Sequence, residues 1–170
     1  MRELILGGAR SGKSRYAQAR ATEWALPVRY IATAESLDHE MAQRISRHRQ
    51  DRPEHWEVYE ESIALGALLK DSIAPDRVVL VDCLTLWLSN LLCLNDHNRF
   101  AQERQALLDA LAEPVGPVIL VSNEVGQGVI PDNALARQFV DATGWLHQAL
   151  AEQCERVSLV VAGLPLTLKS

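Results

Sequence analysis

Residues 7–14 read GGARSGKS, and their types and spacing suit the binding of phosphate groups. They fit the pattern G-x-x-x-x-G-K-[ST], after the apolar run of residues 4–6 and before the helix-forming stretch of residues 14–25. Glycines let successive backbone N–H groups point inward at phosphate oxygens, and the start of a helix adds a positive end. We therefore expect the whole loop to bind a nucleotide: Gly7, Gly8, Ala9, Arg10, Ser11, Gly12, Lys13 and Ser14.

Two side chains of this loop and one acid further along the chain predict how a triphosphate and its metal are held. The Lys13 ammonium is a compact charge for the β- and γ-phosphates, and the Ser14 hydroxyl is a ligand for Mg²⁺. Asp82 ends the apolar run of residues 77–82, where an acid can bind Mg²⁺ directly or through water. A helical pattern follows, so capping that helix is the structural alternative for Asp82, and both roles are compatible. The loop alone does not separate a kinase from an ATPase or a GTPase.

A single histidine lies among arginines in the stretch RISRHRQDR, residues 44–52. His48 falls at the end of an apolar stripe spaced i, i+4, i+8, i+11 along a helix predicted over residues 38–51. Neighbouring cations disfavour imidazolium, so His48 should be neutral near pH 7 and able to attack phosphorus. The arginines would then hold nucleotide phosphates. From the residues alone, a solvated basic helix face is the favoured interpretation and the nucleophile is the alternative.

Apolar runs alternate with helical patterns along the chain, which predicts an α/β fold with a largely parallel sheet. With the phosphate-binding pattern, this indicates a three-layer fold like that of P-loop NTPases. The last apolar run follows a short turn at Gly163 and is expected to be an antiparallel edge strand. We predict strands over residues 3–6, 28–33, 55–60, 77–82, 117–123, 156–163 and 164–169, and helices over residues 14–25, 38–51, 62–73, 84–92, 98–113 and 132–154.

Composition limits the class of protein. A chain of 170 residues suits a single domain, which we assign to residues 1–170. A net charge of −5 argues against a nucleic-acid partner, whereas the local cluster of arginines favours a small anionic ligand. Three cysteines without a CxxC pair predict free thiols in a cytoplasmic protein. We expect no signal peptide, and no apolar run approaches the ~20 residues of a membrane span.

Several segments in a fixed order resemble the bifunctional adenosylcobinamide kinase / adenosylcobinamide-phosphate guanylyltransferases of cobalamin biosynthesis. The resemblance runs almost end to end and rests above all on LILGGARSGKSRYAQ, RISRHRQDRPEHW and SNEVGQGVIPDNALARQFVDATGW. It implies that a nucleoside triphosphate phosphorylates the aminopropanol hydroxyl of adenosylcobinamide. It also implies that GTP then transfers GMP to a histidine and on to that phosphate, which yields adenosylcobinamide-GDP and pyrophosphate.

The resemblance also implies site residues, cofactors and partners. It makes His48 the guanylylated residue, which reverses the preference drawn from the residues alone. GTP, ATP and Mg²⁺ are the implied cofactors, adenosylcobinamide and its phosphate the small-molecule substrates, and a homo-oligomer, a trimer, the implied assembly. Besides residues 7–14, the implied nucleotide contacts are Thr33, Ala34, Glu35, Arg49, Gln50, Asp51, Arg52, Glu60 and Asp82.

Physical reasoning supports part of this mapping. Residues 33–35 lie just beyond a predicted strand, where open α/β sheets bind ligands. Glu60 ends another strand and could accept hydrogen bonds from the N1–H and 2-amino group of guanine; its alternative is an ordinary surface carboxylate. Asn123 and Glu124 also follow a strand, where they would line the site or shape the turn around the next glycines.

The chain departs from the family pattern at two positions that bear on chemistry. Arg47 precedes His48, where some relatives have a second histidine, so one histidine is available for the covalent step. Asp82 stands where relatives often have glutamate, and the shorter acid would favour water-mediated metal binding.

Two other functions compete with the bifunctional enzyme. A single-activity P-loop kinase for another small alcohol would not need His48. A non-catalytic GTP-binding switch would bind nucleotide at the same loop but would have no phosphoacceptor.

Overall fold

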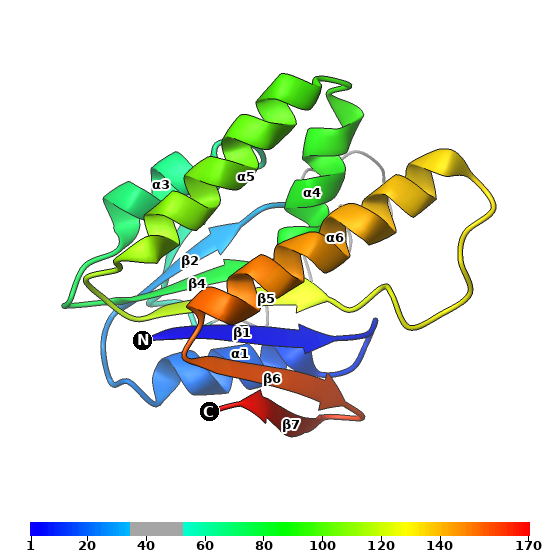
Figure 1. Ribbon diagram of the computed structural model, residues 1–170. Coiled ribbons are helices and arrows are strands. Elements are labelled where there is room, and N and C mark those ends of the chain that lie inside the picture. Colours follow the sequence, from blue (N-terminus) through cyan, green and yellow to red (C-terminus); the bar gives the residue numbers. More distant parts are fainter. Residues whose placement is uncertain (35–52) are drawn as a thin grey trace.

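Seven strands form one sheet in the computed structural model of the chain, which describes residues 1–34 and 53–170. The order across the sheet is β3-β2-β4-β5-β1-β6-β7, and all neighbours are parallel except β6 and β7 (Figure 1). This confirms the expected α/β fold and its antiparallel C-terminal edge strand. The strands are β1 (Arg2–Gly7), β2 (Val28–Ala32), β3 (Glu57–Glu60), β4 (Val78–Asp82), β5 (Val118–Asn123), β6 (Arg156–Val161) and β7 (Leu164–Lys169).

Helices cover both faces of the sheet and complete three layers. The helix α1 (Lys13–Thr22) packs on one face through Ala17 and Ala21. The opposite face carries α3 (Leu65–Ser72), α4 (Leu84–Cys93), α5 (His97–Ala112) and α6 (Ala134–Gln153), as Figure 1 shows.

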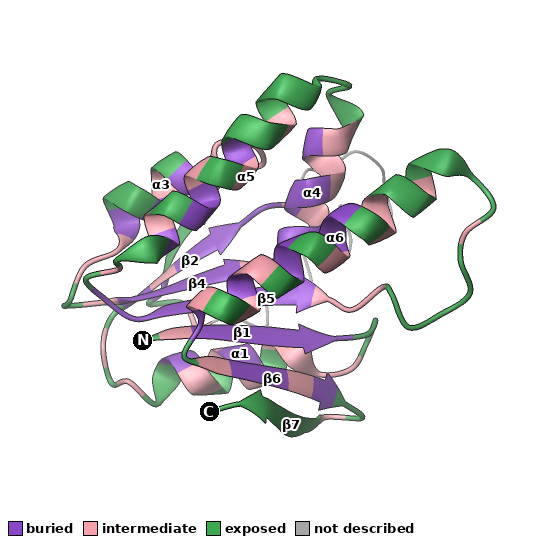
Figure 2. Cartoon of the chain, in the orientation of Figure 1, coloured by how far each residue is buried: buried purple, intermediate pink, exposed green. Residues whose placement is uncertain are grey.

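The strand β1 shows why the central strands read as continuous apolar runs. Leu4 and Leu6 join the core beneath α4, α5 and α6, whereas Ile5 between them joins the core beneath α1. A strand covered on both faces is apolar at most positions, because successive side chains point to opposite sides. The purple centre of the sheet in Figure 2 is this doubly covered region, and the strand β7 at its edge is exposed throughout.

Helix boundaries differ slightly from the predicted ones. The first helix begins at Lys13 and ends at Thr22, short of Ala25, which takes a positive φ of 52° and cannot continue a right-handed helix. At the start of α6, the Asn133 side chain accepts a hydrogen bond of 2.7 Å from the backbone N–H of Ala136, so Asn133 rather than Asp132 is the cap. The helix predicted over residues 38–51 lies outside the described residues.

The parallel strands bring distant residues to one edge of the sheet. The register pairs Gly7 with Asn123 and Ala32 with Asp82 across neighbouring strands. The strand β5 lies between β1 and β4, so its end separates the phosphate-binding loop from Asp82. Ligands of open α/β sheets bind at this carboxyl edge.

Candidate nucleotide-binding site

The loop between β1 and α1 has the shape that the sequence pattern predicts. The backbone N–H of Ser11 donates to the Gly8 carbonyl at 3.3 Å, which closes a turn before the helix. Gly12 precedes the first helical residue, Lys13, and has a φ of 91°. Because a helix start exposes N–H donors and the positive end of the helix dipole, the loop is suited to an anion.

The lysine of the loop folds back over the loop. Lys13 Nζ donates to the Gly8 carbonyl at 3.4 Å. Burial raises the pKa of the Cys83 thiol at the end of β4, and the charge of Lys13 acts in the opposite direction on it. The Lys13 ammonium thus lies against the loop that precedes it, and its contact with phosphates stays a prediction.

The Asp82 carboxylate lies at the carboxyl end of β4 and is partly exposed. The Tyr30 hydroxyl donates to Asp82 Oδ2 at 3.1 Å. Cys83, not Asp82, is the N-cap of α4, so the structure gives Asp82 no role in capping that helix. Asp82 follows the strand next but one to β1 and not a neighbour of β1, and its binding of Mg²⁺ stays a prediction.

Behind this edge lies a polar network that sequence analysis missed. Thr33 Oγ1 donates to the Cys83 carbonyl at 2.6 Å and accepts from the Cys83 backbone N–H at 3.0 Å. Asn123 Nδ2 donates to Thr85 Oγ1 at 2.9 Å, and Asn90 Nδ2 donates to the Thr33 carbonyl at 2.9 Å. The network ties the ends of β2, β4 and β5 together beneath the site. Its one sequence signal was the polar residues within the apolar stretch CLTLWLSNLLCL.

Thr33 was expected to face a ligand beyond the end of its strand, but its side chain faces the interior. Its side chain is fully buried and hydrogen-bonded to the backbone of Cys83. A direct contact between this hydroxyl and a nucleotide would require those bonds to break, and it stays a prediction. Ala34, the next residue, is half-buried beyond the end of β2.

The structure separates the two adjacent acids at the end of β3. Glu61 Oε1 accepts hydrogen bonds of 2.8 Å from the backbone N–H groups of Ile63 and Ala64, so this carboxylate shapes the turn before α3. Glu60 is the last residue of β3. The contact of Glu60 with guanine stays a prediction.

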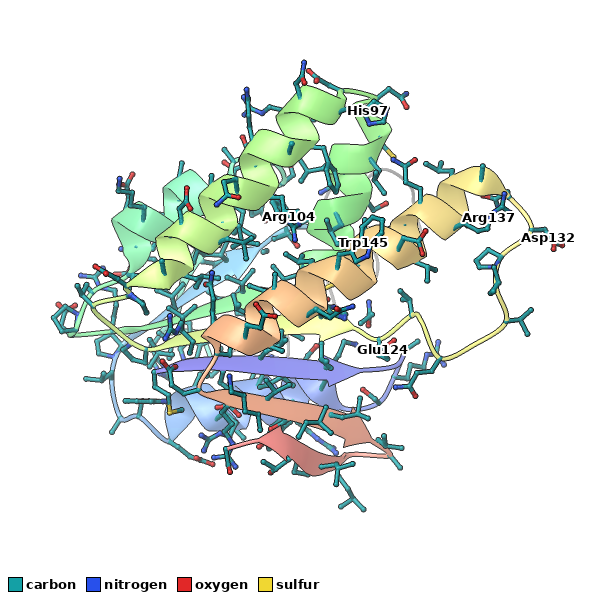
Figure 3. All side chains as sticks on the ribbon, viewed as in Figure 1. His97, Arg104, Glu124, Asp132, Arg137 and Trp145 are labelled. Carbon is teal, nitrogen blue, oxygen red and sulfur yellow. The ribbon has the colours of Figure 1, made fainter. Side chains whose placement is uncertain are left out.

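A buried histidine holds the loop that follows β5. His147 Nε2 lies 2.8 Å from Ser122 Oγ, and His147 Nδ1 lies 3.8 Å from Glu124 Oε2. Burial lowers the pKa of His147, and the charge of Glu124 offsets this only in part, so the imidazole is neutral. Glu124 Oε1 accepts from the Gly126 N–H at 2.7 Å, and the Glu124 N–H donates to the Gly7 carbonyl at 3.0 Å. Figure 3 shows Glu124 where the loop between β5 and α6 leaves the edge of the sheet.

The remaining predicted site residues cannot be placed. Glu35, His48 and residues 49–52 lie outside the described residues. Within the part of the chain that the structure describes, no group of three or more His, Cys, Asp or Glu side chains is arranged to hold a metal ion. No helix in residues 1–34 and 53–170 is long and apolar enough to span a membrane.

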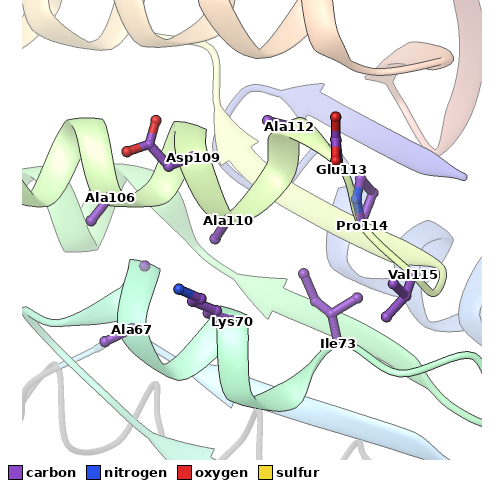
Figure 4. Close-up of a pocket in the computed structure, with 11 residues that line it drawn as sticks. Ala67, Lys70, Ile73, Ala106, Asp109, Ala110, Ala112, Glu113, Pro114 and Val115 are labelled. Carbon is purple, nitrogen blue, oxygen red and sulfur yellow. The ribbon is translucent and has the colours of Figure 1, made fainter.

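A groove of about 520 Å³ lies elsewhere, between α3 and α5 (Figure 4). Ile73 lines it just before β4, and Pro114 and Val115 line it just before β5. These positions belong to the amino ends of the strands, opposite the phosphate-binding loop. The groove is therefore separate from the candidate site.

Comparison with protein families decides the class of this site. A model of the cobinamide kinase / cobinamide phosphate guanyltransferase family matches residues 3–168. The chain belongs to this family. As the sequence led us to expect, it is an enzyme of the bifunctional cobinamide kinase and guanylyltransferase class.

Individual relatives of the cobinamide kinase / guanyltransferase family match over almost their whole lengths. The bifunctional adenosylcobalamin biosynthesis protein CobP of Pseudomonas aeruginosa is 57% identical over 169 residues, which cover 99% of this chain and 98% of that protein. The bifunctional adenosylcobalamin biosynthesis protein CobU of Escherichia coli is 42% identical over 179 residues and covers 98% of both proteins.

Solved structures of more distant proteins share the fold alone. The RadB recombinase has a TM-score of 0.55 at 17% identity, with coverage of 93% of this chain and 73% of that one. A protein from Pyrococcus horikoshii has a TM-score of 0.57 at 9% identity, with coverage of 99% and 85%. These likenesses support the P-loop NTPase-like fold predicted from the loop pattern.

Proposed function

We propose that this chain catalyses two successive reactions on a corrinoid. It phosphorylates the aminopropanol hydroxyl of adenosylcobinamide with ATP or GTP, and it then transfers GMP from GTP to that phosphate. The observation that carries the proposal is the family match over residues 3–168 together with a phosphate-binding loop of the predicted shape. Residues 1–170 would serve both reactions as one domain.

In the first reaction the chain's task is to hold a triphosphate and stabilise its charge. The backbone N–H groups of the loop and of the first turn of α1 bind phosphate oxygens, and Lys13 binds the β- and γ-phosphates. Ser14 and Asp82 offer two oxygen ligands, which fits Mg²⁺ because that ion takes one or two protein ligands beside phosphate oxygens. When bound, Mg²⁺ supplies charge neutralisation between the phosphates.

In the second reaction the imidazole of His48 attacks the α-phosphorus of GTP. An N–P bond forms and pyrophosphate leaves. A phosphate oxygen of adenosylcobinamide phosphate then attacks the same phosphorus, the N–P bond breaks, and the imidazole is restored. Arg49, Gln50, Asp51, Arg52 and Glu60 would bind the guanine nucleotide during these steps.

Two isotope labels distinguish this proposal from its competitors. Purified protein is incubated with adenosylcobinamide and with GTP labelled at the γ- or the α-phosphorus. The bifunctional enzyme should transfer the γ label in the first reaction and the α label, as GMP, in the second. A single-activity kinase would transfer only the γ label, and a nucleotide switch would transfer neither. Replacing GTP by ATP in the γ-label assay identifies the phosphate donor.

We also propose that the chain forms a homo-oligomer, a trimer, in the cytoplasm. The cytoplasm supplies the triphosphates, and Cys83, Cys93 and Cys154 are free thiols. The strand β7 carries an apolar surface suited to a second copy. Val161 and Leu164 pair across β6 and β7, and their side chains are 58% and 72% exposed; Leu166 is 59% exposed. Exposed apolar edge strands are uncommon unless another chain covers them.

The Leu166→Lys variant tests this surface. We expect it to lower the oligomeric mass seen by light scattering, because a buried lysine in an apolar interface is costly. Val115→Lys is the matched control, since Val115 is 69% exposed at the far end of the strands. A monomeric wild type would contradict the oligomer, and an unchanged mass in Leu166→Lys would contradict the placement of its interface.

A further inference from the structure

The turn between β6 and β7 lies against the phosphate-binding loop. Ala162 and Gly163 are its two central residues, with φ values of 53° and 81°. Positive φ at both positions is what a tight type I′ hairpin turn requires. From this turn the Gly163 N–H donates a hydrogen bond of 2.8 Å to the Ser11 carbonyl in the loop.

The turn and its preceding strand also explain two of the loop's glycines. A Cβ atom on Gly7 would lie 2.7 Å from the Val160 carbonyl oxygen, a separation that side chains do not reach without displacing backbone. A Cβ on Gly12 would lie 3.1 Å from the Gly163 Cα, and Gly12 also has a φ of 91°. Gly7 and Gly12 thus let the hairpin approach the loop at both of its ends.

The third glycine of the loop behaves differently. A Cβ on Gly8 would meet no atom within 4 Å among the described residues. That open side is where phosphate groups can approach the backbone. The loop is therefore supported on one side by the hairpin and open on the other.

We propose that the β6–β7 turn is a positioning element that keeps the loop's N–H donors in the arrangement that binds phosphates, and that Gly163 is its key residue. The inference rests on the nucleotide binding proposed above. Gly163 acts through Ser11 and Gly12 and does not itself contact the nucleotide. Its N–H holds the Ser11 peptide, and its backbone leaves no room for a side chain at Gly12, the residue before α1.

Substitution at residue 163 should disturb the loop through backbone strain. A β-branched side chain is strongly disfavoured at a φ of 81°. The nearest neighbour of a new Cβ is Arg15 Nη2 at 3.2 Å, the end of a flexible, exposed side chain that can move away. Relief of the strain must therefore come from the turn itself, which carries the Gly163 N–H away from Ser11.

The test measures dissociation constants of GTP and ATP for the whole protein by calorimetry. In Gly163→Val we expect both constants to rise on the order of tenfold, because one or two hydrogen bonds to charged phosphate oxygens are misaligned. The loss should be equal for the two nucleotides, because the loop contacts phosphates and not the base. Gly163→Ala introduces less strain, so this variant should fold and both dissociation constants should rise about threefold.

Asn95→Val is the matched control for general destabilisation. Asn95 also has a positive φ, 53°, but it lies between α4 and α5. We expect it to lower the melting temperature as Gly163→Val does and to leave both dissociation constants unchanged. Ala162→Gly should also keep them unchanged, because it removes strain from the same turn.

The outcomes separate this inference from the proposed function. Unchanged constants in both Gly163 variants would overturn the inference, and so would a loss for one nucleotide only, which would indicate a contact with the base. Equal losses of nucleotide affinity in Gly163→Val and Asn95→Val would overturn it as well, because the loss would then come from general destabilisation of the protein. A wild-type protein that binds neither nucleotide would contradict the proposed function and the inference together.

Discussion

His48→Ala is expected to abolish transfer of GMP while phosphorylation of adenosylcobinamide continues. The imidazole is the proposed nucleophile of the second reaction only, and no other side chain of the protein is proposed to bond to phosphorus in that reaction. Removal of a nucleophile lowers turnover by at least about 10³-fold. With GTP labelled at the α-phosphorus, the wild type should carry an acid-labile, base-stable label that the variant lacks. The γ label should still reach the corrinoid.

The control is a histidine with no proposed role. His97 begins α5 and is exposed, so His97→Ala should keep both activities and the protein label. Equal loss of the two activities in His48→Ala, with the fold intact by circular dichroism, would contradict the assignment of His48 to the second reaction alone. Retention of the label on the variant protein would contradict the nucleophile itself.

The fold was predictable because its determinants are local. A strand covered on both faces is mostly apolar, so β4 and β5 stand out by the continuous apolar runs that begin VVLVD and VILVSN. The glycine-rich loop is equally local, since strand, turn and helix follow one another within residues 2–22. Family membership was predictable for the same reason, because the matching segments are long and in a fixed order.

The surroundings of the site were not predictable, because they depend on contacts between distant segments. The pattern GGARSGKS explains its glycines by phosphate binding, yet Gly7 and Gly12 are also constrained by a hairpin near the C-terminus. Nothing near Ser11 in the sequence indicates that Gly163 donates to its carbonyl.

Thr33 shows the same limit. It follows a strand, as ligand-binding residues often do, but its hydroxyl is buried against Cys83. Asn90 and Thr85, on α4, donate to and accept from residues at the same carboxyl edge of the sheet. The sequence predicted only that this segment is a helix. Sequence position predicts which edge of the sheet a residue reaches, but it does not determine whether the side chain faces the ligand or the interior.

Lys13→Ala is expected to reduce both reactions by about 10²–10³-fold, the usual cost of removing one donor from developing negative charge. The described residues contain one such glycine-rich loop, and its lysine donates to the Gly8 carbonyl within it. If the same loop holds the triphosphate in both steps, transfer of the γ label to adenosylcobinamide and of the α label to added adenosylcobinamide phosphate must fall together, and the nucleotide dissociation constant must rise.

The matched control for this loss is Lys70→Ala, which removes an exposed lysine of α3 beside the distant groove and should leave both reactions unchanged. The informative contrast is between the two labels in Lys13→Ala. Loss of γ transfer with intact α transfer would mean that GTP occupies a second place during guanylylation, and the loop would then serve the kinase step alone. With adenosylcobinamide phosphate supplied as the GMP acceptor, parallel loss would mean that the same loop holds the triphosphate in both reactions. The first triphosphate donates its γ-phosphoryl group to the substrate hydroxyl, and a second one, GTP, presents its α-phosphorus to His48. In that case the two chemistries differ in which nucleophile approaches the nucleotide, and not in where the nucleotide binds.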